Sequence, residues 1–294
     1  MKIVVIGANG QLGCDLVRAF STNKDEVCEL SHLDIEVANR ESVSRALTSL
    51  QPEVIVNTAA MHHVESCERD PERAFAVNAL GPKNLAQVAR GLGATLIHVS
   101  TDYVFDGRKT NPYVEEDAPR PLNVYGATKL VGEYFVRCSM DRHFIVRTSA
   151  LYGKNACRAK GGLNFVELML KLAKERSEVR VVASEVVSPT YTPELANQIV
   201  ALSRCEAFGV YHATAEGSCS WYDFAREIFA LTHTHVSLQV AGPNEFPAKA
   251  PRPGNSVLEN RGLKRIGLNR FKSWKDGLCS YLGASQPRRA AVTQ

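Results

Sequence analysis

The stretch Gly7-Ala8-Asn9-Gly10-Gln11-Leu12-Gly13 decides the fold. It follows a β-branched run, Lys2–Ile6, that is typical of a strand buried on both faces of a parallel sheet, and it leads into a helical pattern over Leu12–Phe20. The first glycine allows a tight turn, the second lets a pyrophosphate approach the backbone, and the third lets helix and strand pack closely. The helix N-terminus then offers unpaired N–H groups to phosphates. The pattern therefore predicts a dinucleotide-binding turn.

Outward from this turn, strand-like and helix-like segments alternate. Further strands are predicted at Glu26–Leu30, Val54–Asn57, Thr95–Ser100 and His143–Thr148, and further helices at Arg40–Leu50, Ala74–Gly91 (with a break or fresh start at Pro82) and Tyr125–Arg137. This rhythm predicts an α/β fold, a Rossmann-type doubly wound parallel sheet, here taken in the strand order 3-2-1-4-5-6.

After Thr148 the rhythm loosens, which predicts a smaller mixed α/β lobe. Helices are expected at Asn164–Arg176, Thr192–Ser203 and Ser220–Thr232, strands at Val179–Ala183 and Val210–Ala213, and no regular structure at Ala241–Asn255. We expect a dinucleotide-binding Rossmann domain over 1–149 and mainly a substrate-binding lobe over 150–284, with some elements returning to the sheet. The small polar residues 285–294 predict a flexible tail.

Composition excludes several classes of protein. The 294 residues are 45% hydrophobic and 22% charged, as in an ordinary globular chain, so fibrous and disordered readings are excluded. No apolar run approaches the roughly 20 residues that span a bilayer, and no signal peptide is recognisable, so a cytoplasmic protein without a membrane partner is expected. The net charge of +4 forms no basic stripe with aromatics, so nucleic-acid binding is not expected. Eight dispersed cysteines without a C-x-x-C pair favour isolated thiols over a zinc or disulfide framework.

The end of the second strand bears on the choice of cofactor. Leu30-Ser31-His32 lacks the acidic residue that normally binds the ribose 2′-OH of NAD, and Ser31 and His32 tolerate a 2′-phosphate, so NADPH is favoured over NADH. Asp34 is expected beside the adenine, with an ordinary turn aspartate as the alternative. The predicted cofactor contacts are Gly7, Asn9, Gly10, Gln11, Leu12, Gly13, Ser31, Asp34, Ile35, Ala59, Ala60, Tyr125 and Lys129.

Tyr125-Gly126-Ala127-Thr128-Lys129 places a phenol and an ammonium at i and i+4 on one helix face. A nearby ammonium favours the phenolate and lowers the pKa of a tyrosine from about 10. Such a tyrosine can protonate a carbonyl oxygen while a hydride arrives at the carbon, and the lysine can hold a ribose hydroxyl. Thr101, at the end of the fourth strand, is expected to orient the carbonyl by a hydrogen bond. An ordinary helix tyrosine and strand-end threonine are the alternatives.

These residues together resemble the extended short-chain dehydrogenase/reductase superfamily and, within it, the dTDP-4-dehydrorhamnose reductase family. The matching segments are Gly10–Gly13, Asn57–Ala60, Ser100–Gly107, Pro121–Gly126 leading to Lys129, Arg147–Ser149, Ser188–Thr190 and Arg252–Ser256. The resemblance implies Thr101, Tyr125 and Lys129 as the catalytic trio. It also implies NADPH- or NADH-dependent reduction of the 4-keto group of a nucleotide-linked deoxysugar, dTDP-4-dehydrorhamnose to dTDP-rhamnose. Substrate contacts are expected at Thr101, Asp102, Tyr103, Asn123, Ala150 and Arg252.

The chain departs from the family pattern at two places. Ala150 stands where an aromatic residue is usual, and Met61-His62 stand where Tyr-Thr is usual, followed by His63. Both changes bear on the shape of the pocket rather than on the trio. Two other functions therefore stay open at this point: a sugar-nucleotide epimerase or dehydratase that recycles its cofactor, and a cofactor-binding regulatory subunit without turnover.

A metal-linked homodimer is a further property of some members of the family. Asp15 and Glu194 fall where two carboxylate ligands of a magnesium ion would lie, but Lys275 stands at the third position with Asp276 beside it. Because a hard cation requires oxygen ligands, we expect no metal site. Formation of a homodimer without a metal remains an open alternative.

Overall fold

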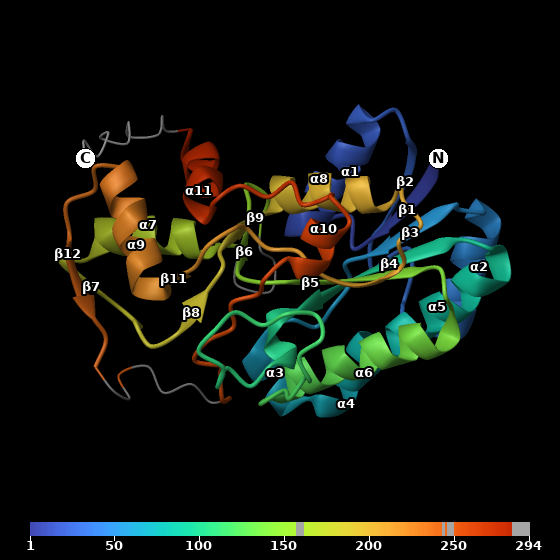
Figure 1. Cartoon of the computed structure of the whole chain (residues 1–294), viewed down its shortest axis with the longest axis horizontal. Coiled ribbons are helices and arrows are strands. Elements are labelled where there is room, and N and C mark those ends of the chain that lie inside the picture. The colour runs from blue at the N-terminus through green and yellow to red at the C-terminus, as the bar shows by residue number, and fades with distance from the viewer. Residues whose placement is uncertain (157–161, 243–244, 246–249, 284–294) are drawn as a thin grey trace.

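Six parallel strands form the central sheet of the computed structural model, which describes residues 1–156, 162–242, 245 and 250–283 (Figure 1). The strands lie in the order β2-β1-β3-β4-β5-β10. Their bounds are β1 (Lys2–Ile6), β2 (Glu26–Leu30), β3 (Val54–Asn57), β4 (Thr95–Thr101), β5 (His143–Thr148) and β10 (Gly209–His212). The predicted α/β class and doubly wound parallel sheet are confirmed.

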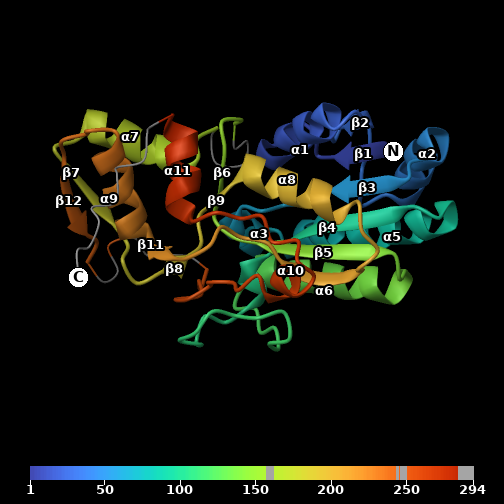
Figure 2. The ribbon, with the colours of Figure 1, turned by 45° about the horizontal axis from the view of Figure 1, so that its top comes forward.

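The pleat of β1 divides the core into two layers, because consecutive side chains point to opposite faces. Ile3 and Val5 pack with α1 (Gln11–Thr22) and α8 (Thr192–Leu202), whereas Val4 and Ile6 pack toward the other helices of the sheet. That second layer holds α2 (Arg40–Leu50), α5 (Gly81–Leu92) and α6 (Val124–Ser139). Figure 2 shows α1 and α8 on one side of the sheet and α6 on the other. Both faces of the central strands are therefore dry, as their continuous apolar runs predict.

The expected strand order was wrong in one respect. β1 pairs with β2 and β3, so β4 lies between β3 and β5 and does not touch β1. The order 3-2-1-4-5-6 needs a further strand between β2 and α2, but residues 31–39 form turns. The strand order consequently reverses between β1 and β3, and the carboxyl ends of these two strands flank the switch point.

Between β3 and α5 the chain passes through short helical pieces: α3 (Val64–Arg69), α4 (Pro71–Phe75) and a π-helical turn, η1 (Ala76–Leu80). Pro82 stands in the first turn of α5, so it begins a fresh helix as expected, in a position where its missing N–H costs nothing. After β4, a short 3₁₀ turn, η2 (Asp102–Val104), leads away from the sheet edge.

The second half of the chain builds a smaller lobe with its own apolar core around Phe224 and Trp274. Its helices are α7 (Phe165–Glu175), α9 (Trp221–Leu231) and α11 (Trp274–Leu282). Its strands form three two-stranded ladders: β6 (Leu151–Tyr152) with β9 (Thr190–Tyr191), β7 (Glu178–Val181) with β12 (Ser237–Val240), and β8 (Val186–Val187) with β11 (Cys219–Ser220). In Figure 1 this lobe lies to the left of the sheet.

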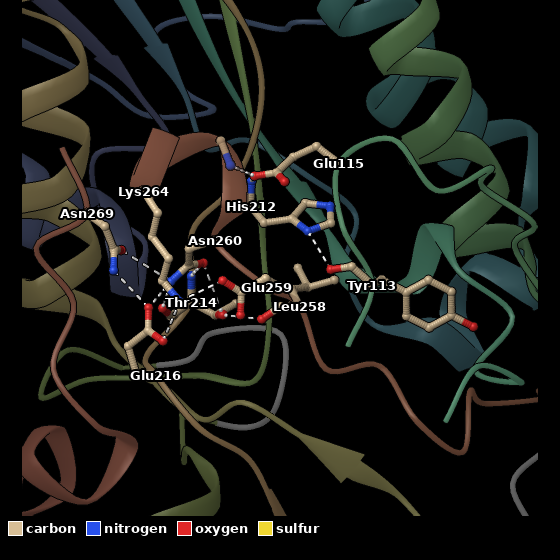
Figure 3. Close-up of polar contacts among 11 residues, drawn as sticks. Tyr113, Glu115, His212, Thr214, Glu216, Leu258, Glu259, Asn260, Lys264 and Asn269 are labelled. Atoms are coloured by element: carbon tan, nitrogen blue, oxygen red, sulfur yellow. Dashed lines mark hydrogen bonds and ion pairs between the residues drawn. The ribbon is translucent and has the colours of Figure 1, made fainter. Parts of the chain in front are cut away.

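The same half also returns to the sheet, through α8, β10 and α10 (Arg261–Arg265). A polar cluster fastens it there (Figure 3): the carboxylate of Glu115 accepts hydrogen bonds from the backbone N–H groups of His212 and Gly262, both at 2.9 Å. The amide of Asn260 accepts from Thr214 N at 3.0 Å and donates to Thr214 O at 2.7 Å. These bonds satisfy buried backbone groups beside the edge strand β10.

Some predictions from the sequence remain untested. The division at residue 149 into a nucleotide-binding domain and a substrate-binding lobe stays a prediction. The predicted tail 285–294 lies outside the described residues, as does part of the segment 241–255. Among the residues that the structure describes, no helix is long and apolar enough to cross a membrane.

Candidate active site

Thr101 and Tyr125 converge at the carboxyl edge of the sheet. Thr101 is the last residue of β4, and Tyr125 lies in the first turn of α6, close enough to Thr101 for its hydroxyl to act on the pKa of the phenol. The Thr101 hydroxyl also donates to Asp102 Oδ1 at 3.1 Å and accepts from the backbone N–H of Tyr103 at 3.2 Å. The threonine and tyrosine that were predicted from separate motifs therefore share one site.

The start of α6 is held in place by several contacts, which fixes Tyr125. Asn123 is the N-cap, and its Oδ1 accepts from Gly126 N at 2.9 Å. The carboxylate of Glu68, on α3, accepts from Val124 N at 2.8 Å. A Cβ at Gly126 would lie 2.1 Å from Tyr103 O, so only glycine lets the helix approach the η2 turn this closely. A rigid helix end therefore supports the phenol.

Lys129 lies one turn further along α6 and is 2% exposed. Its Nζ donates to Val99 O at 2.7 Å and lies 3.4 Å from His98 Nε2. Burial lowers the pKa of Lys129 to about 8, and the nearby Glu133 carboxylate acts in the opposite direction. The amine thus exchanges protons much closer to neutral pH than an exposed lysine.

The effect that we expected Lys129 to have on Tyr125 is not what the structure shows. Burial raises the pKa of Tyr125 above its usual value; the nearby Thr101 hydroxyl opposes this, and the nearby Asp102 and Cys67 add to it. Lys129 Nζ is directed to β4 instead, where it meets Val99 O and His98. Tyr125 is therefore a neutral phenol at pH 7, which is the form that can donate a proton.

One helical turn beyond Lys129, a buried ion pair joins α6 to the sheet. Arg147 on β5 and Glu133 on α6 are 2.7 Å apart, with side chains 4% and 2% exposed. Arg147 Nε also donates to both oxygens of Glu133, at 3.0 and 3.2 Å, and Ser100 donates to Oε1 at 2.5 Å. Each charge is thus compensated in a dry environment, as a stable buried pair requires.

The glycine turn has the geometry that close approach to a phosphate demands. Gly7 has φ +79°, and a Cβ there would lie 2.6 Å from Thr58 Oγ1. A Cβ at Gly13 would lie 2.1 Å from Gly7 O, so this glycine lets α1 pack on the turn. Gln11 donates to Gly153 O at 3.3 Å and to Asn155 O at 3.1 Å, so it links α1 to the second half of the chain.

Some of the other predicted cofactor contacts are partly exposed at the edge of the sheet, and others are buried in the core or close a turn. Ala59 and Ala60 follow β3 at the same edge and are partly exposed, as are Asn9 and Gly10, whereas Leu12 packs in the core. Asp34 accepts from Ser31 N at 2.8 Å and from Ser31 Oγ at 2.7 Å, so in this structure it closes a turn. Ile35 is 3% exposed and packs in the core layer of α2 and α5.

Among the predicted substrate contacts, two hold the site together. Asp102 is 4% exposed and accepts from Thr101 and from Ser149 Oγ, the latter at 2.8 Å; burial raises its pKa. Asn123 uses its amide nitrogen to bind Pro251 O at 2.9 Å. Asp102 therefore holds the proton of the Thr101 hydroxyl in this structure, and Asn123 ties the 250–256 segment to α6.

The remaining predicted substrate contacts are Tyr103, Arg252 and Ala150. The ring of Tyr103 packs edge-on against Tyr125, with centroids 5.9 Å apart. Arg252 pairs with Glu65 on α3 at 2.6 Å, which joins the 250–256 segment to the first half of the chain. Ala150 has φ +45°, a backbone conformation that is unusual for a residue with a Cβ and that often marks a functional site.

Sequence reasoning missed the buried polar residues behind the trio: His98, Glu133 and Asn78. Asn78 lies in the π-helical turn η1; its amide donates to Thr128 Oγ1 at 3.2 Å and exchanges hydrogen bonds with the backbone of Met61. A polar residue inside an otherwise apolar run, as in Thr95–Thr101, is the signal that could have found His98. The two histidines that depart from the family pattern lie nearby, and His63 caps α3 through Ser66 N.

Two of the three carboxylates considered for magnesium, Asp15 and Asp276, have other partners, whereas Glu194 Oε2 is buried without a hydrogen-bond partner among the described residues. Asp15 accepts from Thr192 Oγ1 at 2.6 Å and pairs with Arg18 at 2.9 Å, and Asp276 completes the N-terminal cap of α11. Lys275 pairs with Glu227 at 3.2 Å. Within the described part of the chain, no group of three or more His, Cys, Asp or Glu residues could hold a metal ion.

A glycine turn at the switch point of a parallel sheet, with a threonine, tyrosine and lysine at the same edge, defines an oxidoreductase of the short-chain dehydrogenase/reductase class. Residues 1–286 match the family model described as the RmlD substrate binding domain, and the chain belongs to that family.

Named relatives cover almost the whole chain. A spore coat polysaccharide biosynthesis protein of Bacillus subtilis is 38% identical over 96% of each chain. The crystal structure of a dTDP-4-dehydrorhamnose reductase from Clostridium acetobutylicum is 39% identical, with a TM-score of 0.92, and covers 96% of this chain and 99% of its own. That of a dTDP-4-dehydrorhamnose reductase from Bacillus anthracis, in complex with NADP, is 36% identical, with a TM-score of 0.91 and coverages of 96% and 98%.

Proposed function

We propose that this protein reduces the 4-keto group of dTDP-4-dehydrorhamnose to give dTDP-rhamnose, with NADPH as the reductant. The observation that carries the proposal is the convergence of Thr101, at the end of β4, with Tyr125, in the first turn of the helix that also bears Lys129. Two full-length relatives of known structure are reductases of this kind. The epimerase or dehydratase and the regulatory subunit are not favoured, because neither function is what these relatives are named for.

The glycine turn supports the choice of a dinucleotide. Gly7 and Gly10 leave backbone partly exposed at the N-terminus of α1, and a Cβ at Gly7 or at Gly13 would collide with Thr58 Oγ1 or with Gly7 O. Such a turn lets a pyrophosphate lie against N–H groups. When bound, NADPH supplies the hydride. The relative with bound NADP agrees with this choice, and NADH stays the alternative.

The chain's own residues would supply the proton and the orientation. Tyr125, held neutral by burial, donates its phenolic proton to the carbonyl oxygen as the alkoxide forms. In this structure the single proton of the Thr101 hydroxyl is donated to Asp102 Oδ1, so on substrate binding the hydroxyl would turn to donate to the same carbonyl oxygen instead. We keep Lys129 as the third member of the trio: its Nζ faces β4 in this structure, and its ammonium would hold a ribose hydroxyl of NADPH. We keep Tyr103, Ala150 and Arg252 as substrate contacts, 150–284 as the lobe that carries the nucleotide sugar, and a homodimer as an untested prediction.

The test follows loss of NADPH absorbance with a panel of dTDP-, UDP- and GDP-linked 4-keto sugars. The Tyr125→Phe variant should lose about 10²–10⁴-fold in kcat, the contribution of a positioned general acid, and should bind NADPH with unchanged affinity. Tyr134→Phe is the matched control, since Tyr134 lies on the same helix and is 48% exposed. Near-normal turnover by Tyr125→Phe would disprove the mechanism. Tightly bound NAD with turnover and no added cofactor would favour the epimerase or dehydratase, and a stoichiometric enzyme partner without turnover would favour the regulatory subunit.

A further inference from the structure

A buried histidine that the trio does not explain lies directly behind Lys129. His98 is in the middle of β4 and is fully buried. In the parallel register, Asn57 at the end of β3 stands beside it, so their side chains project to the same face. His98 Nδ1 is 3.1 Å from Asn57 Nδ2, and His98 Nε2 is 3.4 Å from Lys129 Nζ. The imidazole therefore bridges an amide and the lysine amine.

The orientation of the Asn57 amide determines which nitrogen of His98 carries the proton. Asn57 Oδ1 accepts from the backbone N–H of Ala59 at 3.1 Å. The amide nitrogen is therefore the atom that faces His98, and an amide nitrogen can only donate. His98 Nδ1 must accept this bond, so a neutral ring holds its single proton on Nε2. Burial and the neighbouring Lys129 hold the pKa of His98 far below its usual value, which keeps the ring neutral.

The proton on Nε2 points at an amine that cannot accept it while it is charged. An ammonium group has three donors and no lone pair, whereas a neutral amine has one lone pair. Lys129 Nζ already donates to Val99 O at 2.7 Å. The charged group that faces Lys129 from its own helix is Glu133, which favours the ammonium, and Glu133 is itself paired with Arg147 at 2.7 Å. Burial favours the neutral form, and His98, from β4, lies 3.4 Å from the amine.

We propose that Asn57 and His98 act as a positioning pair that stabilises the neutral amine of Lys129 by a hydrogen bond from His98 Nε2–H. The proposal rests on the proposed function. When Lys129 gives a proton to water, an N–H bond breaks, an O–H bond forms on the water, and the amine is left neutral with its lone pair toward His98. The hydronium ion returns the proton to the amine in the reverse step. No oxidation accompanies these transfers.

The first test reads the tautomer without any turnover. Nitrogen-15 NMR of the histidine rings in the full-length protein, with the His98 signals assigned by their loss in His98→Phe, should show an unprotonated Nδ1 and a protonated Nε2 that do not titrate between about pH 6 and 8. A proton on Nδ1, or a ring that titrates in this range, would overturn the proposal. Because substrate is not needed, this result is independent of whether the proposed reaction is correct.

The second test reverses the tautomer. Asn57→Asp keeps the shape of the side chain but offers His98 Nδ1 an acceptor, so the ring proton should move to Nδ1 and Nε2 should accept from the lysine ammonium. The alkaline limb of the kcat–pH profile should then move up by about one pH unit, the size expected for one exchanged hydrogen bond. A purely structural pair would lower stability and leave this limb in place.

His98→Phe supplies the matched background for the second test. In His98→Phe the Asn57→Asp substitution should no longer move the alkaline limb, because its effect passes through the imidazole. The same shift with and without His98 would mean that the introduced carboxylate acts directly on the lysine, and would overturn the proposal. Absence of reductase activity in the wild-type protein would instead contradict the proposed function and leave the tautomer result standing.

Discussion

Replacing Glu133 by leucine should expose the cost of an unpaired charge inside this fold. The substitution removes four hydrogen bonds, three from Arg147 and one from Ser100, and leaves the Arg147 guanidinium 4% exposed with no carboxylate beside it. Breaking a buried pair in this way typically costs about 3–5 kcal/mol. At roughly 2–4 °C per kcal/mol for a chain of this size, the melting temperature should fall by about 6–20 °C.

The assay is urea and thermal unfolding followed by far-ultraviolet circular dichroism, with the double variant Glu133→Leu/Arg147→Met alongside. Removing both charges removes the desolvation cost of each, so the double variant should recover most of the loss and end within about 1–2 kcal/mol of the wild type. Glu175→Leu is the control, because its pair with Lys171 is more than half exposed and should be worth less than about 0.5 kcal/mol. A loss under about 1 kcal/mol for Glu133→Leu, or a double variant as unstable as the sum of the singles, would refute the reasoning.

Two further predictions concern the glycine turn and the edge of the sheet. Gly13→Ala places a Cβ 2.1 Å from Gly7 O, so NADPH should bind at least about 10-fold more weakly in a fluorescence titration. The control is Gly91→Ala, where nothing lies within 4 Å of the added Cβ and α5 should be stabilised by about 0.5–1 kcal/mol. Equal NADPH affinity in both variants would contradict the role assigned to Gly13. Burial raises the pKa of Glu115, so the folded state holds its proton at a higher pH than the unfolded state, and the wild type gains stability as pH falls through that raised pKa. Glu115→Gln keeps an acceptor for His212 N and should be the more stable form at pH 7 by urea unfolding, with an advantage that shrinks toward pH 4–5; an advantage that grows on acidification would show the sign to be wrong.

The nucleotide-binding half was predictable because its signals are local. The β-branched runs of β1 and β3 end where the sequence predicts, and Asn39, a residue type that favours the N-cap, caps α2 through Ser42 N. The glycine turn and the Tyr125–Lys129 spacing each lie within one short segment. Periodicity and capping act over a few residues, so they can be read before the fold is known.

The parts that could not be predicted depend on distant partners. β6 and β9 have two residues each, too few for any alternation to show, and they exist because Leu151 and Thr190 meet in the fold. The direction of Lys129 depends on His98, 31 residues away, and on the burial of both. Strand order likewise depends on whether residues 31–39 add a strand, and turns of this kind carry no periodic signal.

The position of β10 has a consequence for how the chain is made. β5 ends at Thr148, yet its outer neighbour Gly209–His212 leaves the ribosome some sixty residues later. Until then the nascent protein carries an open, apolar strand edge, of the kind that invites pairing with another chain. The segment between these strands also holds α8, which covers one face of the sheet. The N-terminal half therefore completes its own fold only after the first part of the C-terminal half, through β10, has been synthesised.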